Sequence, residues 1–361
     1  MSLITKKNIL FQATNIIKQY FPPFAIEILK NIKYDFLNIY RIYKYNLSFV
    51  EKKEPKQIIK NLYQTTQKIF SPARKTILFY PNFPYHRASI YQLCLALGYH
   101  VTQNPQSKFD AAIYWKRYAT FFPENPILSS FIAENKTVIN DRCQDISKSY
   151  IDEVFLNVFG YCISVDPLKY TGKCVAKSDL NARHDGKIID CPISSKQSKV
   201  VYQKLIENEI EPGKLVEFRV PIFKQTIPLV YTYLKNISNA EQRFLGYPNL
   251  ISVEITEASQ IFTSKEIDNI LEFCSQIGLD YGELDILKDK QDNKIYIIDA
   301  NNTPSSTLLL EPVIMSAEKC LLSYEERASA IDKLIKAFQA EILNTNNSDR
   351  SSLSNKILER I

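Results

Sequence analysis

Hydrophobic residues recur at helical spacing in the first part of the chain, with basic residues between them. One such repeat runs through Ala25, Leu29, Ile32, Phe36, Ile39 and Tyr43. The spacing predicts helices across residues 3–70, the second of which begins at Pro22-Pro23, because the fixed φ of proline suits a first helical turn. Two interpretations of this basic, aromatic face stay open: a helical hairpin packed on the main body, or a helix that docks on a membrane surface or a partner.

Short apolar runs replace this pattern after residue 71. The runs predict strands at Lys75–Tyr80, Ala111–Trp115 and Thr137–Asn140, with an amphipathic helix at Ser89–Leu97. Strands that alternate with short helices are typical of a small parallel sheet, which we expect here. A further helix is predicted over Ser147–Phe159, and Gly160 ends it.

From residue 173 onward the runs are rich in Val, Ile, Tyr and Phe and predict mostly β-structure. The strand candidates are Lys173–Lys177, Lys187–Asp190, Val200–Ile206, Leu215–Ile222 and Ile227–Tyr233. After them we expect a helix over Ser264–Ile277 closed by Gly278, two strands over Tyr281–Leu287 and Lys294–Asp299 around the polar turn 289–293, and a mainly helical stretch over Ser316–Leu343. The tail from Asn344 is polar, and we expect it to fray.

Glycine is scarce, with 8 in 361 residues, whereas the usual share is about 7%. Neither of the glycine-rich phosphate loops, GxxxxGK[ST] or GxGxxG, occurs. A P-loop NTPase and a dinucleotide-binding Rossmann domain are therefore not expected. The length is sufficient for two or three lobes around a large core.

The rest of the composition, 45% apolar and 23% charged, is that of an ordinary globular protein. No run of about 18 uncharged apolar residues is present, and the N-terminus lacks the features of a signal peptide. The seven cysteines form no CxxC pair, so we interpret them as reduced thiols of a cytoplasmic protein. With only three histidines, a zinc site is not expected.

The net charge of +6 is unevenly distributed. Residues 1–60 hold 11 Lys/Arg and 4 Asp/Glu, a net +7, while the remainder holds 34 and 35, a net −1. A nucleic-acid-binding protein would more often spread a basic face over its folded domain, so we expect no nucleic-acid partner. The basic segment instead allows a peripheral membrane or partner contact.

The most informative stretch lies between residues 278 and 306. Asp285 and Asp299 each interrupt a strongly apolar strand, and Asn301 follows Asp299 by two residues, on the same strand face. A short turn joins the two strands, so the three side chains are expected on one side. Carboxylate and amide oxygens without His or Cys suit Mg²⁺. The alternative is a pair of strand-end carboxylates that cap turns.

This pattern, D-(x)13-D-x-N-x-x-P ending at Pro304, resembles the metal-binding end of ATP-grasp enzymes. The resemblance implies that Asp285, Asp299 and Asn301 hold one or two Mg²⁺ ions, with Mn²⁺ as an alternative, that bridge the phosphates of ATP. The family more often has Glu where this chain has Asp299. A shorter side chain alters whether the residue bridges both metals, but Asp can also serve as a ligand.

Two upstream lysines are similar to the phosphate-binding lysines of the same family. Lys177 lies in KCVAKSD about 100 residues before the metal motif, and Lys148 lies in DISKSY before a helix. A strand lysine that points at a polyphosphate supplies the charge that a glycine loop does not provide here. The alternative is that either residue is a solvated surface lysine.

The run 201–206 resembles the hinge between the two lobes of these enzymes, where backbone groups pair with adenine. The resemblance implies this role for the backbone of Gln203 and Leu205, with Lys204 in place of a common Glu. An apolar wall would cover the face of the adenine.

Three polar residues follow on the next strands. Glu217 is similar to the acid that binds the ribose hydroxyls, and Arg219, on the same strand face, is a candidate for contacts with phosphates or an acidic substrate. Lys235 is a weaker phosphate candidate. The alternative for all three is plain ion pairing between strands.

The loop 181–186 occupies the place where ATP-grasp enzymes have a mobile loop that closes over the triphosphate. Arg183 and His184 are candidates for contacts with phosphates or an acyl phosphate, and Gly186 supplies the turn. A lone loop histidine is, however, more often a surface residue.

The resemblance covers roughly residues 75–320 and implies an α+β ATP-grasp fold, in which two α+β subdomains grip ATP. It divides the chain into a basic helical segment (1–70), an α/β parallel-sheet lobe (71–140), subdomain A (141–206), subdomain B with the metal site (207–343) and a flexible tail (344–361). The implied activity is an ADP-forming ligase that joins a small-molecule or peptide carboxylate to an amine or other nucleophile. A kinase of the same fold and a non-catalytic nucleotide-binding relic are the alternatives. The substrate and the oligomeric state stay open.

Overall fold

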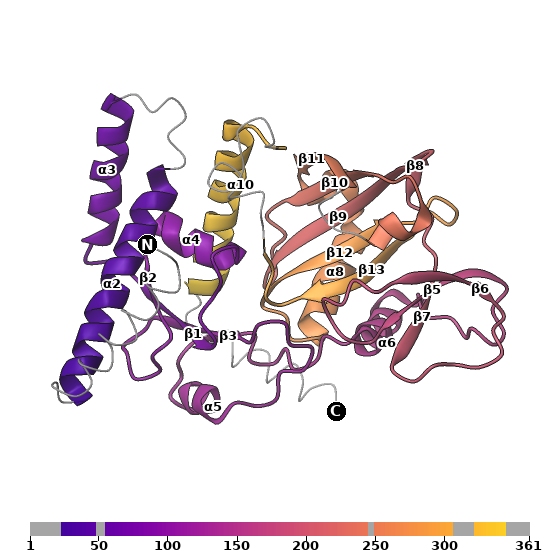
Figure 1. Ribbon diagram of the computed structural model, residues 1–361, viewed down its shortest axis with the longest axis horizontal. Coiled ribbons are helices and arrows are strands. Elements are labelled where there is room, and N and C mark those ends of the chain that lie inside the picture. The colour runs from indigo at the N-terminus through magenta and orange to yellow at the C-terminus, as the bar shows by residue number, and fades with distance from the viewer. Residues whose placement is uncertain (1–22, 48–54, 245–248, 306–320, 344–361) are drawn as a thin grey trace, which may run out of the picture.

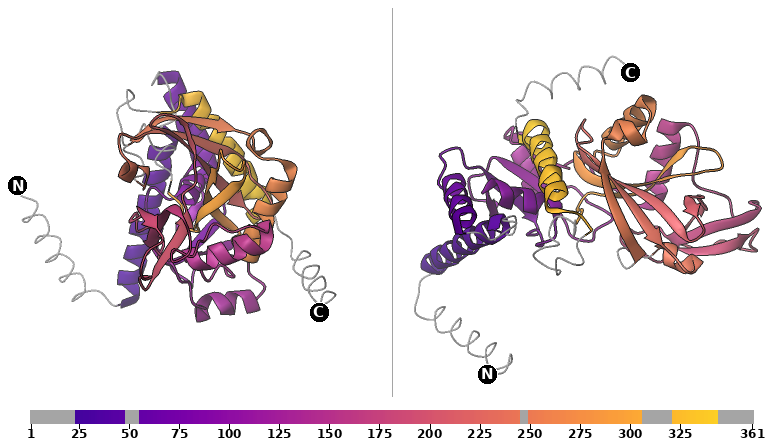
Figure 2. Two further views of the ribbon diagram at one scale, coloured as in Figure 1. Left: turned by 90° about the vertical axis from the view of Figure 1, so that its right-hand side faces the viewer. Right: turned by 90° about the horizontal axis from the view of Figure 1, so that it is seen from above.

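The computed structural model describes residues 23–47, 55–244, 249–305 and 321–343 (Figure 1). Within these ranges the chain forms a helical hairpin, a parallel sheet and two antiparallel sheets. The hairpin lies at one end of the molecule, and the smaller antiparallel sheet lies at the other (Figure 2). The expected α+β architecture, with a parallel-sheet lobe before two β-rich parts, is confirmed.

The hairpin consists of α2 (Pro23–Leu47) and α3 (Pro55–Ile69), and α2 begins at the second proline as expected. The helices run antiparallel, and the Tyr43 hydroxyl lies 2.7 Å from Thr66 Oγ1 between them. Asn38 on α2 donates to the carbonyl of Tyr99 in the lobe. The hairpin is therefore packed on the main body, while residues 3–22 and 48–54 of the predicted helical region lie outside the described residues. No helix in the described ranges is long and apolar enough to cross a membrane.

The lobe is built on a four-stranded parallel sheet in the order β2-β1-β3-β4. Its elements are β1 (Thr76–Pro81), α4 (Ser89–Leu97), β2 (His100–Thr102), β3 (Ala111–Trp115), α5 (Pro126–Ala133) and β4 (Val138–Ile139). The apolar runs do not predict β2 or α5, because a strand of three residues and a helix of eight carry little periodicity.

A three-stranded antiparallel sheet in the order β6-β5-β7 follows helix α6 (Lys148–Phe159). The strands are β5 (Gly172–Ser178), β6 (Lys187–Cys191) and β7 (Val200–Lys204). Its outer side holds a small core cluster of Cys174, Cys191 and Tyr202. The hairpin turn between β5 and β6 contains the loop 181–186.

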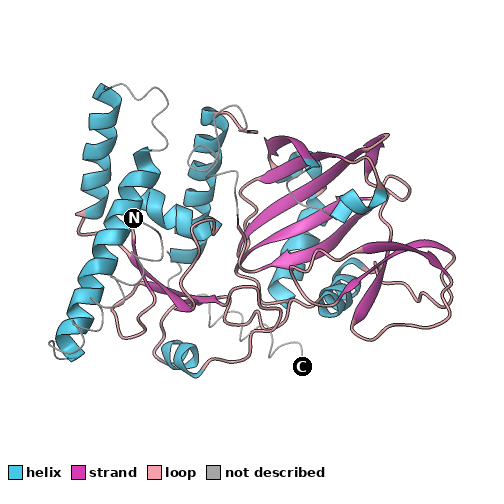
Figure 3. Ribbon diagram, viewed as in Figure 1, coloured by secondary structure: helices cyan, strands magenta, loops and turns pink. Residues whose placement is uncertain are grey.

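The largest sheet has six antiparallel strands, in the order β11-β10-β9-β12-β13 with β8 beside β9. They are β8 (Glu209–Glu211), β9 (Lys214–Phe223), β10 (Val230–Asn236), β11 (Leu250–Thr256), β12 (Tyr281–Lys288) and β13 (Ile295–Asn301). Helices α6 and α8 (Ser264–Gln276) pack on one face of it through apolar side chains (Figure 3). The other face carries the polar residues Glu217, Arg219 and Asp285, and its aromatic residues Phe223 and Tyr281 belong to the core cluster of the parallel-sheet lobe.

Three details differ from the sequence-based expectation. Strand β10 begins at Val230 rather than Ile227, because Pro228 has no N–H for a strand ladder. The edge strand β11 is missing from the expectation, although polar residues alternate along it as in a half-exposed strand. Helix α10 (Tyr324–Ala337) begins after Ser323, whose hydroxyl caps it, so residues 321–323 of the stretch predicted to be mainly helical are not part of the helix.

Short helical segments complete the fold. They are η1 (Ala240–Phe244), α7 (Ala258–Ile261) and η5 (Phe338–Leu343). Residues 316–320 and the tail from residue 344, for which helix and fraying are predicted, lie outside the described residues.

Two helix-ending glycines offer a matched test of backbone packing. Gly278 follows α8 with a φ of 72°, and a Cβ there would lie 2.5 Å from the carbonyl carbon of Arg142. Gly160 ends α6 with a φ of 74°, and nothing lies within 4 Å of its Cβ position. Gly278→Ala is therefore expected to lower the free energy of unfolding by roughly 1–3 kcal/mol more than Gly160→Ala, as measured by urea denaturation. Equal losses would mean that the positive φ alone requires glycine.

Candidate functional site

The pairing of β12 with β13 brings the predicted metal-binding residues together. Asp285 lies directly opposite Asp299, and Glu283 lies opposite Asn301. Because alternate strand residues share a face, all four side chains project from the face that the helices leave open. The register shifts just after Asp285, so Ile298 has no partner in the strand pairing.

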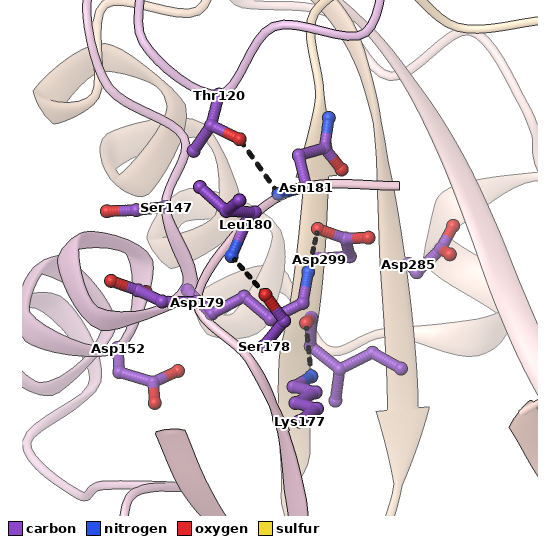
Figure 4. Close-up of polar contacts among 12 residues, drawn as sticks. Thr120, Ser147, Asp152, Lys177, Ser178, Asp179, Leu180, Asn181, Asp285 and Asp299 are labelled. Carbon is purple, nitrogen blue, oxygen red and sulfur yellow. Dashed lines mark hydrogen bonds and ion pairs between the residues drawn. The ribbon is translucent and has the colours of Figure 1, made fainter. Parts of the chain in front are cut away.

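Two lysines, one of them Lys177 (Figure 4), approach these acids from outside the large sheet. Lys148, the first residue of α6, places its Nζ 3.1 Å from Asp299 Oδ1. Lys177 on β5 places its Nζ 3.1 Å from the carbonyl oxygen of Ile298, the residue skipped by the strand pairing. The site therefore lies between the small sheet and the large sheet, where Lys148 contacts Asp299 and Lys177 contacts the backbone of β13.

The environment of Lys177 disfavours its charge. Burial and the nearby charge of Lys148 lower its pKa to about 8, while Asp299, Asp152 and Asp285 oppose the shift. A lysine in this state takes up a proton readily when an anion binds beside it.

Arg219 on β9 joins the acidic group from the other side. It lies opposite Asp285 in the sheet, and its guanidinium is 3.3 Å from Asp285 Oδ2 and 3.0 Å from Glu283 Oε1. Burial raises the pKa of Glu283 to about 7 even though Arg219 lowers it, and burial likewise raises the pKa of Asp285. Arg219 therefore stabilises two carboxylates that lie close together in a poorly solvated place.

Glu217 and Lys235 form a separate pair on the same face of the large sheet. The Lys235 ammonium lies 2.6 Å from Glu217 Oε2, and both side chains are largely buried. The pair matches the alternative of ion pairing between strands, and a nucleotide contact by either residue would require it to rearrange.

The predicted hinge residues have mainly structural partners. The Gln203 side chain donates to Asp152, and Lys204 binds Asp289 at 2.6 Å and Asp292 at 2.9 Å. Burial alone would lower the pKa of Lys204, but its hydrogen bonds to these acids raise it. Lys204 thus ties β7 to the β12–β13 turn, and Leu205 follows directly after β7.

The loop 181–186 is anchored at its base but not at its tip. The Asp179 carboxylate accepts from the backbone N–H of Ser149 at 2.8 Å, which fixes the loop against the start of α6. Arg183 and His184 are exposed, and the structure does not bring them to the carboxylates. Their role in contacting phosphate stays a prediction.

Sequence reasoning overlooked three buried polar residues around the site. Glu283 could have been found by its spacing, two residues before Asp285 on the same face. Asp152 accepts hydrogen bonds from Ser164 and Gln203, and burial raises its pKa despite them. Asn140 follows β4, and no local pattern marks it.

Asn140 connects the lobe to the strand that carries the acids. Its side chain donates to the Tyr281 carbonyl at 2.8 Å and accepts from the Tyr281 N–H at 2.9 Å. Asn140→Ala is expected to lower the free energy of unfolding by about 2–3 kcal/mol, because buried backbone groups lose their partners. Asn135→Ala is the control in the same denaturation experiment, since Asn135 also has a positive φ but is exposed. Similar losses for the two variants would assign the effect to backbone strain.

The donor set fits Mg²⁺. Asp285 and Asp299 carry two carboxylates, and Asn301 carries an amide oxygen that accepts from the Thr303 N–H at 3.0 Å in this structure. In the described part of the chain, no three Asp, Glu, His or Cys side chains converge to form a metal site. A set of two carboxylates and one amide oxygen is nevertheless typical of Mg²⁺, which takes one or two carboxylates and completes its shell with water and substrate phosphates. Lys148 and Arg219 compensate the carboxylate charges in the structure described here.

No family model matches the chain, and no curated protein matches it at a significant level. Comparison with solved structures does find similar chains. Among them are ATP-grasp ligases. The chain is similar to the ATP-grasp ligase PsnB in complex with a minimal precursor, with 12% identity and a TM-score of 0.47 over 73% of this chain and 99% of that one.

Two further solved structures give comparable values. One is the D-alanine–D-alanine ligase from Bacillus anthracis, with 13% identity and a TM-score of 0.44 over 74% of this chain and 99% of that one. The other is the macrocyclase MdnC bound with the precursor peptide MdnA from Microcystis aeruginosa MRC, with 12% identity and a TM-score of 0.38 over 71% and 98%. These values are too low to assign an activity, which rests on the residues of the site.

Proposed function

We propose that this chain is an ATP-dependent ligase of the ATP-grasp type, which activates a carboxylate and joins it to an amine or another nucleophile. One observation carries the proposal. Between the small and the large sheet, Lys148 lies 3.1 Å from Asp299, which is opposite Asp285, and Lys177 lies 3.1 Å from the neighbouring carbonyl of Ile298. Phosphoryl transfer depends mainly on such positioned charges, which neutralise and orient the phosphates.

In this proposal Asp285, Asp299 and Asn301 hold Mg²⁺, which when bound would neutralise charge on the triphosphate. Lys148 and Lys177 would then bind phosphate oxygens in place of their present carboxylate and carbonyl partners. Residues 141–206 and 207–343 would form the two subdomains that hold ATP between them. Residues 71–140 would contribute contacts to the substrate.

The proposed reaction has two steps. An oxygen of the substrate carboxylate attacks the γ-phosphorus of ATP, the bond from that phosphorus to the β,γ-bridging oxygen breaks, and ADP and an acyl phosphate form. The nucleophile then attacks the acyl carbon, loses a proton and displaces inorganic phosphate. Arg219 lies on the open sheet face beside Asp285, where its guanidinium would orient the transferring phosphoryl group.

A screen of carboxylates with and without amines tests this function. The full chain would be incubated with Mg-ATP and each pair, and ADP, inorganic phosphate and product mass would be measured. A ligase releases ADP and phosphate in equal amounts and forms a product lighter than its two substrates by one water. The same screen with Asp299→Asn is the control for contaminating ATPases.

Two other outcomes would replace the proposal. ADP without inorganic phosphate, together with a stable phosphorylated product, would indicate a kinase. ATP binding without ADP formation for any pair would indicate a non-catalytic relic.

A further inference from the structure

An exposed apolar face lies on the N-terminal hairpin. Phe36 and Tyr40 on α2, Ile59 and Tyr63 on α3, and Phe70 just after α3 have between 61% and 74% of their surface exposed. The two residues on each helix are four apart, so each pair projects from one side of its helix. We call these five residues the hairpin face. Scattered exposed apolar residues are normal, but a group on two neighbouring helices points to a binding surface.

Tyr40 and Tyr63 each lie three residues before a residue of the contact between the helices, in which Tyr43 on α2 meets Thr66 on α3, so the two pairs lie on neighbouring parts of one surface. Asn61 on α3 donates to the carbonyl of Asn46 on α2 at 3.1 Å. The opposite sides of the helices are buried in the core through Ile42 on α2 and through Thr65 and Ile69 on α3. Packing of the hairpin on the core therefore uses these buried residues, and it does not require the five residues of the hairpin face.

The charge of the hairpin selects the kind of partner. Helices α2 and α3 together contain seven Lys or Arg and two Asp or Glu. Lys44, Lys56 and Lys60 are exposed near the hairpin face. A second copy of the chain would present the same positive charge and would be repelled. An anionic surface would be attracted, and aromatic residues beside lysines are typical of helices that lie in a lipid headgroup layer.

We propose that the hairpin face binds the surface of an anionic lipid bilayer. The aromatic and aliphatic side chains would enter the headgroup layer, and the lysines would contact lipid phosphates. The hairpin lies at the end of the molecule opposite the small sheet, so the site between the sheets would stay accessible from solution (Figure 1). This inference is independent of the proposed ligase activity.

Vesicle co-sedimentation of the full chain tests the proposal. The vesicles are pure phosphatidylcholine or a mixture of roughly one part phosphatidylglycerol to three parts phosphatidylcholine, at about 0.1 M salt. We expect binding to the mixed vesicles only. The double variant Tyr40→Ser with Tyr63→Ser should bind at least about tenfold more weakly. So should the variant Lys56→Glu with Lys60→Glu.

Matched controls use exposed residues at the other end of the molecule. Ile210→Ser with Ile251→Ser removes two exposed apolar side chains, and Lys173→Glu with Lys265→Glu reverses two exposed charges. Both control variants should bind as the wild type does, and thermal melting should show all four variants folded. The proposal is overturned if the wild type does not bind the mixed vesicles, because another partner would then have to cover the face. It is also overturned if the hairpin variants bind as tightly as the controls.

Discussion

Asp299→Asn is expected to lower ATP turnover by at least about a hundredfold while the protein keeps its fold. Asp299 lies opposite Asp285 and is 3.1 Å from Lys148, so its charge serves both the proposed metal and the phosphate-binding lysine. Asparagine keeps the size of the side chain and one oxygen, so the expected loss comes from the missing charge. ADP formation and the Mg²⁺ dependence of nucleotide binding are the measurements.

The control for this prediction is Asp190→Asn. Asp190 on β6 forms the same kind of pair, with its carboxylate 2.9 Å from the Lys173 ammonium, but both side chains are largely exposed. An exposed ion pair contributes little, so turnover should stay close to that of the wild type. If Asp299→Asn forms ADP at the wild-type rate, the metal assignment is wrong.

Lys177→Gln is expected to weaken ATP binding and to remove a pH dependence that the wild type shows. Lys177 has a pKa lowered to about 8 by burial and by Lys148. Phosphate binds the protonated lysine, so the affinity for ATP should fall as the pH rises above about 8, by up to about tenfold per pH unit. Titration calorimetry measures the affinity for ATP and its pH dependence. A range of about pH 7 to pH 10 extends roughly one pH unit or more to each side of the pKa of Lys177.

The stability of the ligand-free protein should change in the opposite direction. The ordinary pKa of 10.5 applies in the unfolded state, so between about 8 and 10.5 the folded protein holds fewer protons than the unfolded chain. The contribution of Lys177 to the free energy of unfolding therefore rises with pH across this window. The difference between wild type and Lys177→Gln in urea denaturation isolates this contribution from those of the other groups that titrate in the same pH range.

Lys173→Gln is the control on the same strand, because Lys173 is exposed and pairs with Asp190 at the surface. It should leave the pH dependence of ATP binding unchanged. A wild-type pH profile for Lys177→Gln would show that Lys177 does not contact the phosphates.

Local patterns determined the elements that carry the site. The apolar runs around Asp285 and Asp299 predicted two strands, and the alternation of side chains along a strand predicted the acids on one face, an arrangement that the register confirms. The start of α6 after Ser147 and its end at Gly160 also followed from residues within one turn of each boundary. These features depend on neighbours in the sequence, so the sequence by itself determined them.

The tertiary structure decided which of these residues meet. Arg219 is more than 60 residues from the acids it binds, and the register of β9 against β12 places it beside Asp285 rather than at the surface. Lys204 was expected at the nucleotide, but the approach of the β12–β13 turn gives it Asp289 and Asp292 as partners. Strand register and the shift beside Ile298 arise from packing between distant segments, and no local pattern of hydrophobic and polar residues encodes them.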